Sequence, residues 1–157
     1  MTIVEEAEWP KLDIATFNGW RLSVAANQHV LGWLIIFPPL DEEISIVHLT
    51  DEQIIQFKRV GLIAEELLRR TFRSEWFNYL QEGNGVRKLH IHLEPRYSTP
   101  REFGGFHFTD EGWGRKVKFL TAEQLAHKEL VFKIVAELRK NLNEMQIDDF
   151  TVEISTT

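Results

Sequence analysis

The stretch Val86-Arg-Lys-Leu-His-Ile-His-Leu-Glu-Pro-Arg-Tyr97 carries the clearest pattern in the chain. From Lys88 to Glu94 its side chains alternate between polar and aliphatic. Successive side chains of a β-strand face opposite sides of the sheet, so this alternation predicts a strand with one face on a core. His90 and His92 would share the other face, about 6.6 Å apart at roughly 3.3 Å of rise per residue.

The remaining periodic segments predict an α+β fold with an antiparallel sheet and helices on one face. Thr50, followed by Gln53 three residues later, predicts a capped helix that runs to about residue 72. Thr121 and Gln124 repeat the pattern and predict a C-terminal helix over about 121–143. Apolar runs predict further strands over residues 20–26, 30–37, 44–47, 75–81 and 150–154.

Length and composition indicate one globular domain over residues 1–157. No apolar run is long enough to span a membrane. The first twenty residues are acidic where a signal peptide needs a basic start. Because cysteine is absent, neither disulfides nor thiolate chemistry are expected. We therefore expect a soluble, cytoplasmic protein.

The charge distribution constrains the class of ligand. A net charge of −6 argues against a binder of nucleic acid polymers, which are usually basic proteins. Residues 85–118 nevertheless carry more Lys and Arg than Asp and Glu. A locally positive segment on an acidic body suits a small anion, although a chance cluster of solvated charges would look the same.

The segment 98–118 shows no regular period. Six of the nine glycines fall within residues 83–114, and several aromatic side chains lie among them. A loop this long is usually functional or disordered, and its aromatic residues favour a packed flap. Such a flap could close over a site or cover a dimer seam.

The histidine pair has three interpretations. With six histidines in the chain, about one shuffled sequence in five would contain such a pair, so a solvated polar face is one of them. A zinc site is the second, but it needs a third ligand from elsewhere, and Lys88 would repel a cation. Nucleophilic catalysis is the third, with one imidazole attacking and the other assisting.

The neighbours of the pair favour nucleophilic catalysis. An unperturbed imidazole has a pKa of about 6.5, so a neutral nucleophile is available near pH 7. Lys88 beside His90 would keep that ring neutral, while Glu94 beside His92 would favour its protonated form. The Gly83-Asn84-Gly85 run could turn backbone N–H groups toward a phosphate, although an ordinary hairpin turn would use the same residues.

These residues resemble a known family. Asn78-Tyr79, Gly83-Asn84, Val86 and the run from Leu89 to Tyr97 resemble the motif of histidine triad (HIT) proteins. They look most like bacterial members described as diadenosine tetraphosphate hydrolase-like. The similarity covers about residues 20–115, including Trp33–Phe37 and the downstream Trp113-Gly114.

The resemblance implies a fold and a set of roles. It implies about five antiparallel strands with two helices, commonly in a homodimer, and cleavage of a small-molecule nucleotide at its α-phosphate. His90 falls at the attacking histidine, which forms a covalent nucleotidyl-histidine, and His92 falls at the assisting one. Gly83 and Asn84 fall at positions that approach the phosphate, and Asn78 at one that arranges the site.

The chain departs from the family pattern at Lys88, which stands where the first histidine of the triad would be. A supporting histidine after the second strand is also missing, since that segment reads Pro38-Pro39-Leu40-Asp41. Lys88 could contact a phosphate, or it could mark a protein that binds nucleotides without turnover. We expect a HIT-type hydrolase or transferase that requires no cofactor, with Mg²⁺ able to accompany a polyphosphate substrate.

Overall fold

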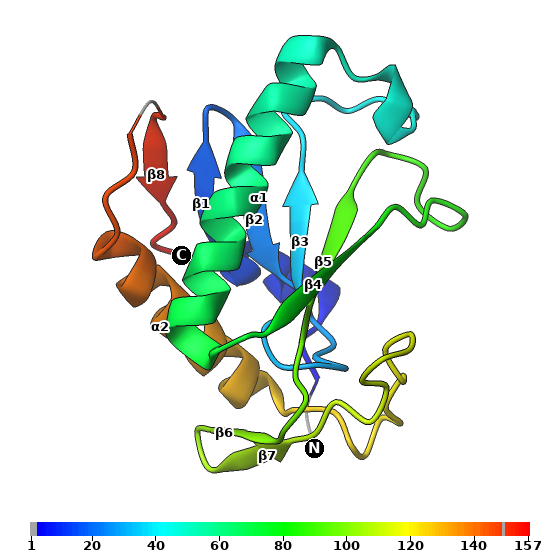
Figure 1. Cartoon of the computed structure of the whole chain (residues 1–157), viewed down its shortest axis with the longest axis vertical. Coiled ribbons are helices and arrows are strands. Elements are labelled where there is room, and N and C mark those ends of the chain that lie inside the picture. Colours follow the sequence, from blue (N-terminus) through cyan, green and yellow to red (C-terminus); the bar gives the residue numbers. More distant parts are fainter. Residues whose placement is uncertain (1–2, 149) are drawn as a thin grey trace.

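The computed structural model describes residues 3–148 and 150–157 and has the expected α+β architecture (Figure 1). In this part of the chain six strands form one antiparallel sheet in the order β4-β5-β3-β2-β1-β8. Its strands are β1 (Asp13–Phe17), β2 (Trp20–Val24), β3 (Leu34–Phe37), β4 (Trp76–Leu80), β5 (Ile91–Arg96) and β8 (Val152–Ile154). The other elements are η1 (Glu6–Leu12), η2 (Ile46–His48), α1 (Asp51–Phe72), β6 (Arg101–Phe103), β7 (Phe106–Phe108) and α2 (Lys128–Asn143).

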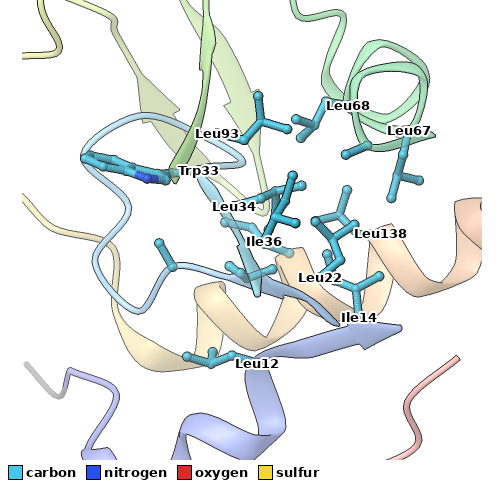
Figure 2. Packing of buried hydrophobic residues seen from close by; sticks show 14 of the residues in the cluster. Leu12, Ile14, Leu22, Trp33, Leu34, Ile36, Leu67, Leu68, Leu93 and Leu138 are labelled. Carbon is cyan, nitrogen blue, oxygen red and sulfur yellow. The ribbon is translucent and has the colours of Figure 1, made fainter. Parts of the chain in front are cut away.

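Both long helices pack on the same face of the sheet (Figure 1). The strand side chains on that face are almost completely inaccessible to solvent. Figure 2 shows several of them beside Leu67 and Leu68 of α1 and Leu138 of α2. They are Ile14, Leu22, Leu34, Ile36, Ile91 and Leu93. The opposite face of the sheet is therefore the one available for a site.

Helix α1 follows its sequence prediction closely. The Thr50 hydroxyl accepts a hydrogen bond from the Gln53 backbone N–H at 3.2 Å, and the Gln53 side chain accepts one from the Thr50 N–H at 2.8 Å. These two bonds satisfy donors that the first helical turn would otherwise leave unpaired. The helix ends at Phe72 and is followed by Arg73, which adopts the left-handed conformation.

Helix α2 begins later than predicted. The Thr121 N–H does donate to the Gln124 side chain at 3.0 Å, so the expected capping contact exists, but it closes an isolated turn. His127 is extended, with φ −62° and ψ 154°, and the helix starts only at Lys128. The predicted start at residue 121 was wrong because a local capping pattern does not reveal whether the next turn continues.

The strand pattern differs from the prediction at three places. Strands β6 and β7 form a short hairpin within residues 98–118, where no regular element was predicted. Residues 44–47 form no strand and lead instead into η2. Strand β1 was not predicted; it pairs with β2 through a turn in which Asn18 and Gly19 both have positive φ, of 48° and 86°. This is the backbone that a two-residue hairpin loop requires, and Asn-Gly supplies it readily.

The connection between β4 and β5 is a long loop. Residues 81–90 separate the strands, and none of Gly83, Asn84 and Gly85 has positive φ, so the expected tight turn is absent from this described segment. Strand β5 starts at Ile91 rather than Lys88. His90 therefore lies on the loop, just before the strand that carries His92.

No helix in the described residues has the length and apolar composition needed to cross a membrane.

Candidate active site

His92 lies on β5, on the face of the sheet opposite to the two long helices. It is paired with Leu80 of β4 on one side and Ile35 of β3 on the other. His90 follows the loop into β5, and its ring centroid lies 5.1 Å from that of His92. The two histidines that the alternating pattern singled out are therefore brought together.

Two hollows meet at this pair. The first, which we call the apolar chamber, has a volume of about 390 Å³ and is formed mainly by η1, β2 and β3, including Trp9, Leu12 and Phe37. The second, the polar chamber, has a volume of about 570 Å³ and is lined by residues 81–86. His90 and His92 line both chambers. A ligand with one apolar and one polar part could thus span them with its junction at the histidines.

The tautomer of His90 follows from its hydrogen bond. Its Nδ1 atom lies 2.8 Å from the backbone carbonyl oxygen of Lys88. A carbonyl oxygen can only accept, so Nδ1 carries a proton and the Nε2 atom of the neutral ring keeps its lone pair. The Phe37 ring lies nearly parallel to the His90 ring, with centroids 6.2 Å apart. His90 thus presents one nucleophilic nitrogen.

His92 is held in the opposite tautomer. Its Nδ1 atom accepts a hydrogen bond from the indole N–H of Trp33 at 3.1 Å. Because indole nitrogen can only donate, the neutral His92 ring has its proton on Nε2. The two rings therefore offer complementary groups, a lone pair on His90 and an N–H donor on His92.

The expectation of a protonated His92 was wrong. Burial, and secondarily the proximity of His90, lowers the pKa of His92, while Glu82 acts in the opposite sense. Glu94 is not among the groups that shift the pKa of His92. Burial raises the pKa of the Glu94 carboxyl group itself, despite an interaction with the Asn78 amide. The sequence could place Glu94 beside His92 but could not show that the carboxyl group is buried.

Lys88 contributes its backbone rather than its side chain to the pair. Its ammonium group forms an ion pair with Asp41 at 2.7 Å, and both side chains are largely exposed. Neither chamber is lined by Lys88. A phosphate contact by this lysine would need the ion pair to open, and it stays a prediction.

The other predicted site residues fall into two groups. Gly83 and Asn84 line the polar chamber beside the histidines. Asn78 lies on β4 opposite Glu94, and these two side chains line a neighbouring hollow with Lys116 and Phe119. Asn78 is therefore close to the pair but outside its two chambers.

A metal site of three protein ligands is not formed within residues 3–148 and 150–157, where no three His, Cys, Asp or Glu side chains gather suitably. The zinc interpretation of the histidine pair thus finds no third ligand there.

Sequence reasoning missed the residues that surround the pair. Trp9 and Leu12 come from a segment with no clear period, so nothing in the sequence linked them to the histidines. Trp33 was assigned to a buried strand, and its partner was not foreseen. A buried tryptophan usually needs an acceptor for its N–H, which is the one signal that could have pointed to a polar neighbour.

Comparison with known proteins concerns the fold. No protein-family model matches the chain, and no curated protein sequence matches it. Solved structures do match. A hypothetical histidine triad nucleotide-binding protein from Sulfolobus tokodaii has 12% identity and a TM-score of 0.61, with coverage of 83% of this chain and 85% of that one.

Two further matches cover almost the whole of the compared proteins. A histidine triad protein from Bradyrhizobium japonicum has 17% identity and a TM-score of 0.59, with 90% of this chain and 99% of that one covered. A histidine triad protein from Marinobacter aquaeolei has 18% identity and a TM-score of 0.53, with coverage of 93% and 100%. At these identities the likeness concerns the fold, and the chain therefore has the fold of histidine triad proteins.

Proposed function

We propose that this chain is a histidine triad protein of the diadenosine tetraphosphate hydrolase-like branch. In this proposal it is a nucleotide hydrolase or transferase that cleaves at the α-phosphate of a dinucleoside polyphosphate or a related nucleotide conjugate. The fold and the motif around His90 and His92 support this proposal.

The observation that carries the proposal is the pair of opposite tautomers at the junction of two unlike chambers. A nucleotide has an apolar base and a charged phosphate, and the two chambers match these parts. Trp9 and Phe37 would contact the base, and the polar chamber would receive the phosphates. The α-phosphate would then lie at the histidines.

In the proposed reaction, His90 Nε2 attacks the α-phosphorus. An N–P bond forms as the bond from phosphorus to the leaving oxygen breaks, and the leaving group takes the electron pair. The proton stays on His90 Nδ1, which donates it in a hydrogen bond to the Lys88 carbonyl oxygen. This hydrogen bond stabilises the positive charge that the ring gains. Water then attacks phosphorus, the N–P bond returns its electrons to Nε2, and the proton of the water passes to solvent.

The remaining site residues have proposed supporting roles. The His92 Nε2–H would donate a hydrogen bond to a phosphate oxygen, and Gly83 and Asn84 would contact the same group from the loop. Asn78 would act indirectly, by fixing Glu94 beside His92. Lys88 would reach a phosphate only after leaving Asp41.

The proposal also covers partners and surroundings. No cofactor is required by this chemistry, and Mg²⁺ would enter as the counter-ion of a polyphosphate substrate. We propose a homodimer, because β4 is an edge strand on which Trp76 and Tyr79 are 67% and 40% exposed. Light scattering would test the dimer. A cytoplasmic location and the lack of a nucleic acid polymer as partner are likewise proposals.

The second candidate function is nucleotide binding without turnover. It is favoured by the replacement of the first triad histidine with Lys88 and by the pairing of that lysine with Asp41.

Intact-protein mass spectrometry after mixing with diadenosine tetraphosphate, without acid quenching, distinguishes the two functions. We expect a protein species heavier by one nucleotidyl group, and its loss in His90→Ala. His107→Ala is the matched control, because His107 is an exposed histidine on β7. Binding measured by calorimetry with neither adduct nor product would refute the enzyme and support the second candidate.

A further inference from the structure

Trp33 is the direct hydrogen-bond partner of His92 in the protein. Its side chain is nearly inaccessible, and its indole N–H donates to His92 Nδ1 at 3.1 Å. The two rings meet edge to face, with centroids 5.6 Å apart and an interplanar angle of 77°. Figure 2 shows the Trp33 ring apart from the aliphatic core, on the chain that leads into β3.

The backbone around Trp33 is fixed by a buried polar side chain. The Gln28 amide donates to the carbonyl oxygens of Ala25 and Trp33, and its oxygen accepts from the Gly32 N–H at 2.7 Å. Gly32 has φ +81°, and a Cβ atom there would lie 2.9 Å from Leu68 and from Phe72. Any other residue would therefore be strained at position 32. The bend at Gly32 directly precedes Trp33 and so affects the direction of its side chain.

Two further rings pack against Trp33: His29 comes from the loop between β2 and β3, and Phe119 comes from the segment before α2. His29 and Phe119 both lie near the indole, with centroids 5.6 Å and 5.9 Å away. These two rings stack on each other at 4.3 Å, and His29 Nδ1 accepts a hydrogen bond from the Leu120 N–H. The two rings thus pack against the Trp33 indole, in addition to its hydrogen bond with His92, and restrict its orientation.

This arrangement limits what His92 can do. Protonation of its second nitrogen would place two N–H donors against each other, one on His92 and one on Trp33. The other titratable groups that act on the ring are His90, which disfavours its positive charge, and Glu82, which favours it. A neutral imidazole can donate a hydrogen bond through Nε2, but it has no readily released proton to give a leaving group.

We propose that Trp33 is a positioning residue that holds His92 as a neutral hydrogen-bond donor, so that His92 stabilises the phosphate without acting as a proton donor. The consequence for substrate selection, given next, rests on the proposed function. A leaving group that receives no proton must depart as a stable anion. The site therefore selects nucleotides whose leaving group is a phosphate or polyphosphate oxygen over those whose leaving group is an amine, which must gain a proton as its bond to phosphorus breaks.

The test compares Trp33→Phe with Trp20→Phe. Phenylalanine keeps an aromatic ring at position 33 and removes the N–H. Trp20 is the matched control, because it is also fully buried and its N–H donates at 2.9 Å to Gln56, outside the two chambers. Long-range ¹H–¹⁵N NMR of the histidine rings reports the tautomer of His92 directly, whether or not the protein is an enzyme.

We expect the neutral His92 ring to carry its proton on Nε2 in the wild type and in Trp20→Phe. In Trp33→Phe we expect the other neutral tautomer to become populated as well. We also expect the His92 ring of Trp33→Phe to become protonated at a higher pH than that of the wild type. An unchanged His92 spectrum in Trp33→Phe would overturn the inference.

The second readout uses diadenosine tetraphosphate and an adenosine 5′-phosphoramidate of a simple alkylamine. We expect the wild type to cleave the phosphoramidate on the order of 10²-fold or more slowly, the usual contribution of a general acid. In Trp33→Phe, the ratio of the rate on diadenosine tetraphosphate to the rate on the phosphoramidate should be about tenfold smaller than in the wild type. Equal rates on both substrates in the wild type would overturn the inference even with an adduct on His90. If the wild type cleaves neither substrate, the proposed function fails, and the NMR result alone decides the role of Trp33.

Discussion

The polar side chains at the two ends of β5 have different surroundings. At its C-terminal end, Arg96 is 3% exposed and bonds both oxygens of Asp110, at 2.7 Å and 3.0 Å, as well as the carbonyl oxygens of Gly112 and Arg115. At its N-terminal end, His92 has Trp33 as a partner and faces two chambers. Both residues project from the same face of the same strand.

The difference separates a structural from a reactive use of polar groups. The guanidinium of Arg96 uses its donors to fix the loop over residues 109–118, so it has little left for a ligand. The histidines keep one ring nitrogen each toward the cavities. A polar group whose hydrogen bonds are all made within the protein stabilises the fold. A polar group that keeps one oriented donor or acceptor unpaired is available for chemistry.

The largest expected effect on stability is at the Arg96 end. Asp110→Ala leaves a buried guanidinium without its carboxylate, which typically costs about 3–5 kcal/mol. We expect a corresponding loss in the free energy of unfolding by urea, with the His90 adduct still forming in the folded fraction. Asp41→Ala is the control: it breaks an exposed ion pair, which contributes about 0–1 kcal/mol. Equal destabilisation by both variants would contradict the distinction between the two ends.

A smaller effect is expected from pH at the histidine end. Burial lowers the pKa of both His92 and His29. A histidine whose pKa is lower in the folded state contributes its full stability above the unfolded pKa, about 6.5, and loses it as the pH falls through the folded value. Glu94 acts oppositely: its raised pKa means that its contribution is lost as the pH rises above about 4.5 through the folded value.

We therefore expect the free energy of unfolding to fall from pH 7 to pH 5, and the fall to be shallower in His92→Gln. Glu94→Gln should raise stability at pH 7, because it removes the cost of a buried charge. Urea titrations at several pH values measure both effects, with His107→Gln as the control that keeps the wild-type slope. A wild-type slope in His92→Gln would show that His92 is not held neutral.

The smallest effect is expected at Lys88. Its contact with His90 is made by the backbone carbonyl, which any residue supplies, and its side chain forms an exposed ion pair. Lys88→Ala should change the rate of adduct formation less than about fivefold, the equivalent of an exposed ion pair. A loss of several hundredfold, measured by rapid-mixing mass spectrometry, would show that the ammonium group contacts the substrate.

Much of this molecule could be predicted from local patterns. The alternation around His92, the capping residues of α1 and the Asn18-Gly19 turn each depend on residues that are close together in the sequence. The start of α2 could not be predicted, because the capping contact of Thr121 and Gln124 looks the same in sequence whether the helix continues or, as here, His127 is extended. The charge state of His92 could not be predicted either, because its burial and the N–H of Trp33 come from segments that are distant in the sequence.

The hydrogen bonds of His90 and His92 hold the two rings in opposite tautomers. Long-range ¹H–¹⁵N NMR on histidine-labelled protein at pH 7.5 tests this arrangement, with His90→Gln and His92→Gln to assign the signals. We expect the proton of the His90 ring on Nδ1 and the proton of the His92 ring on Nε2. The same tautomer on both rings, or a positively charged His92 at this pH, would contradict it.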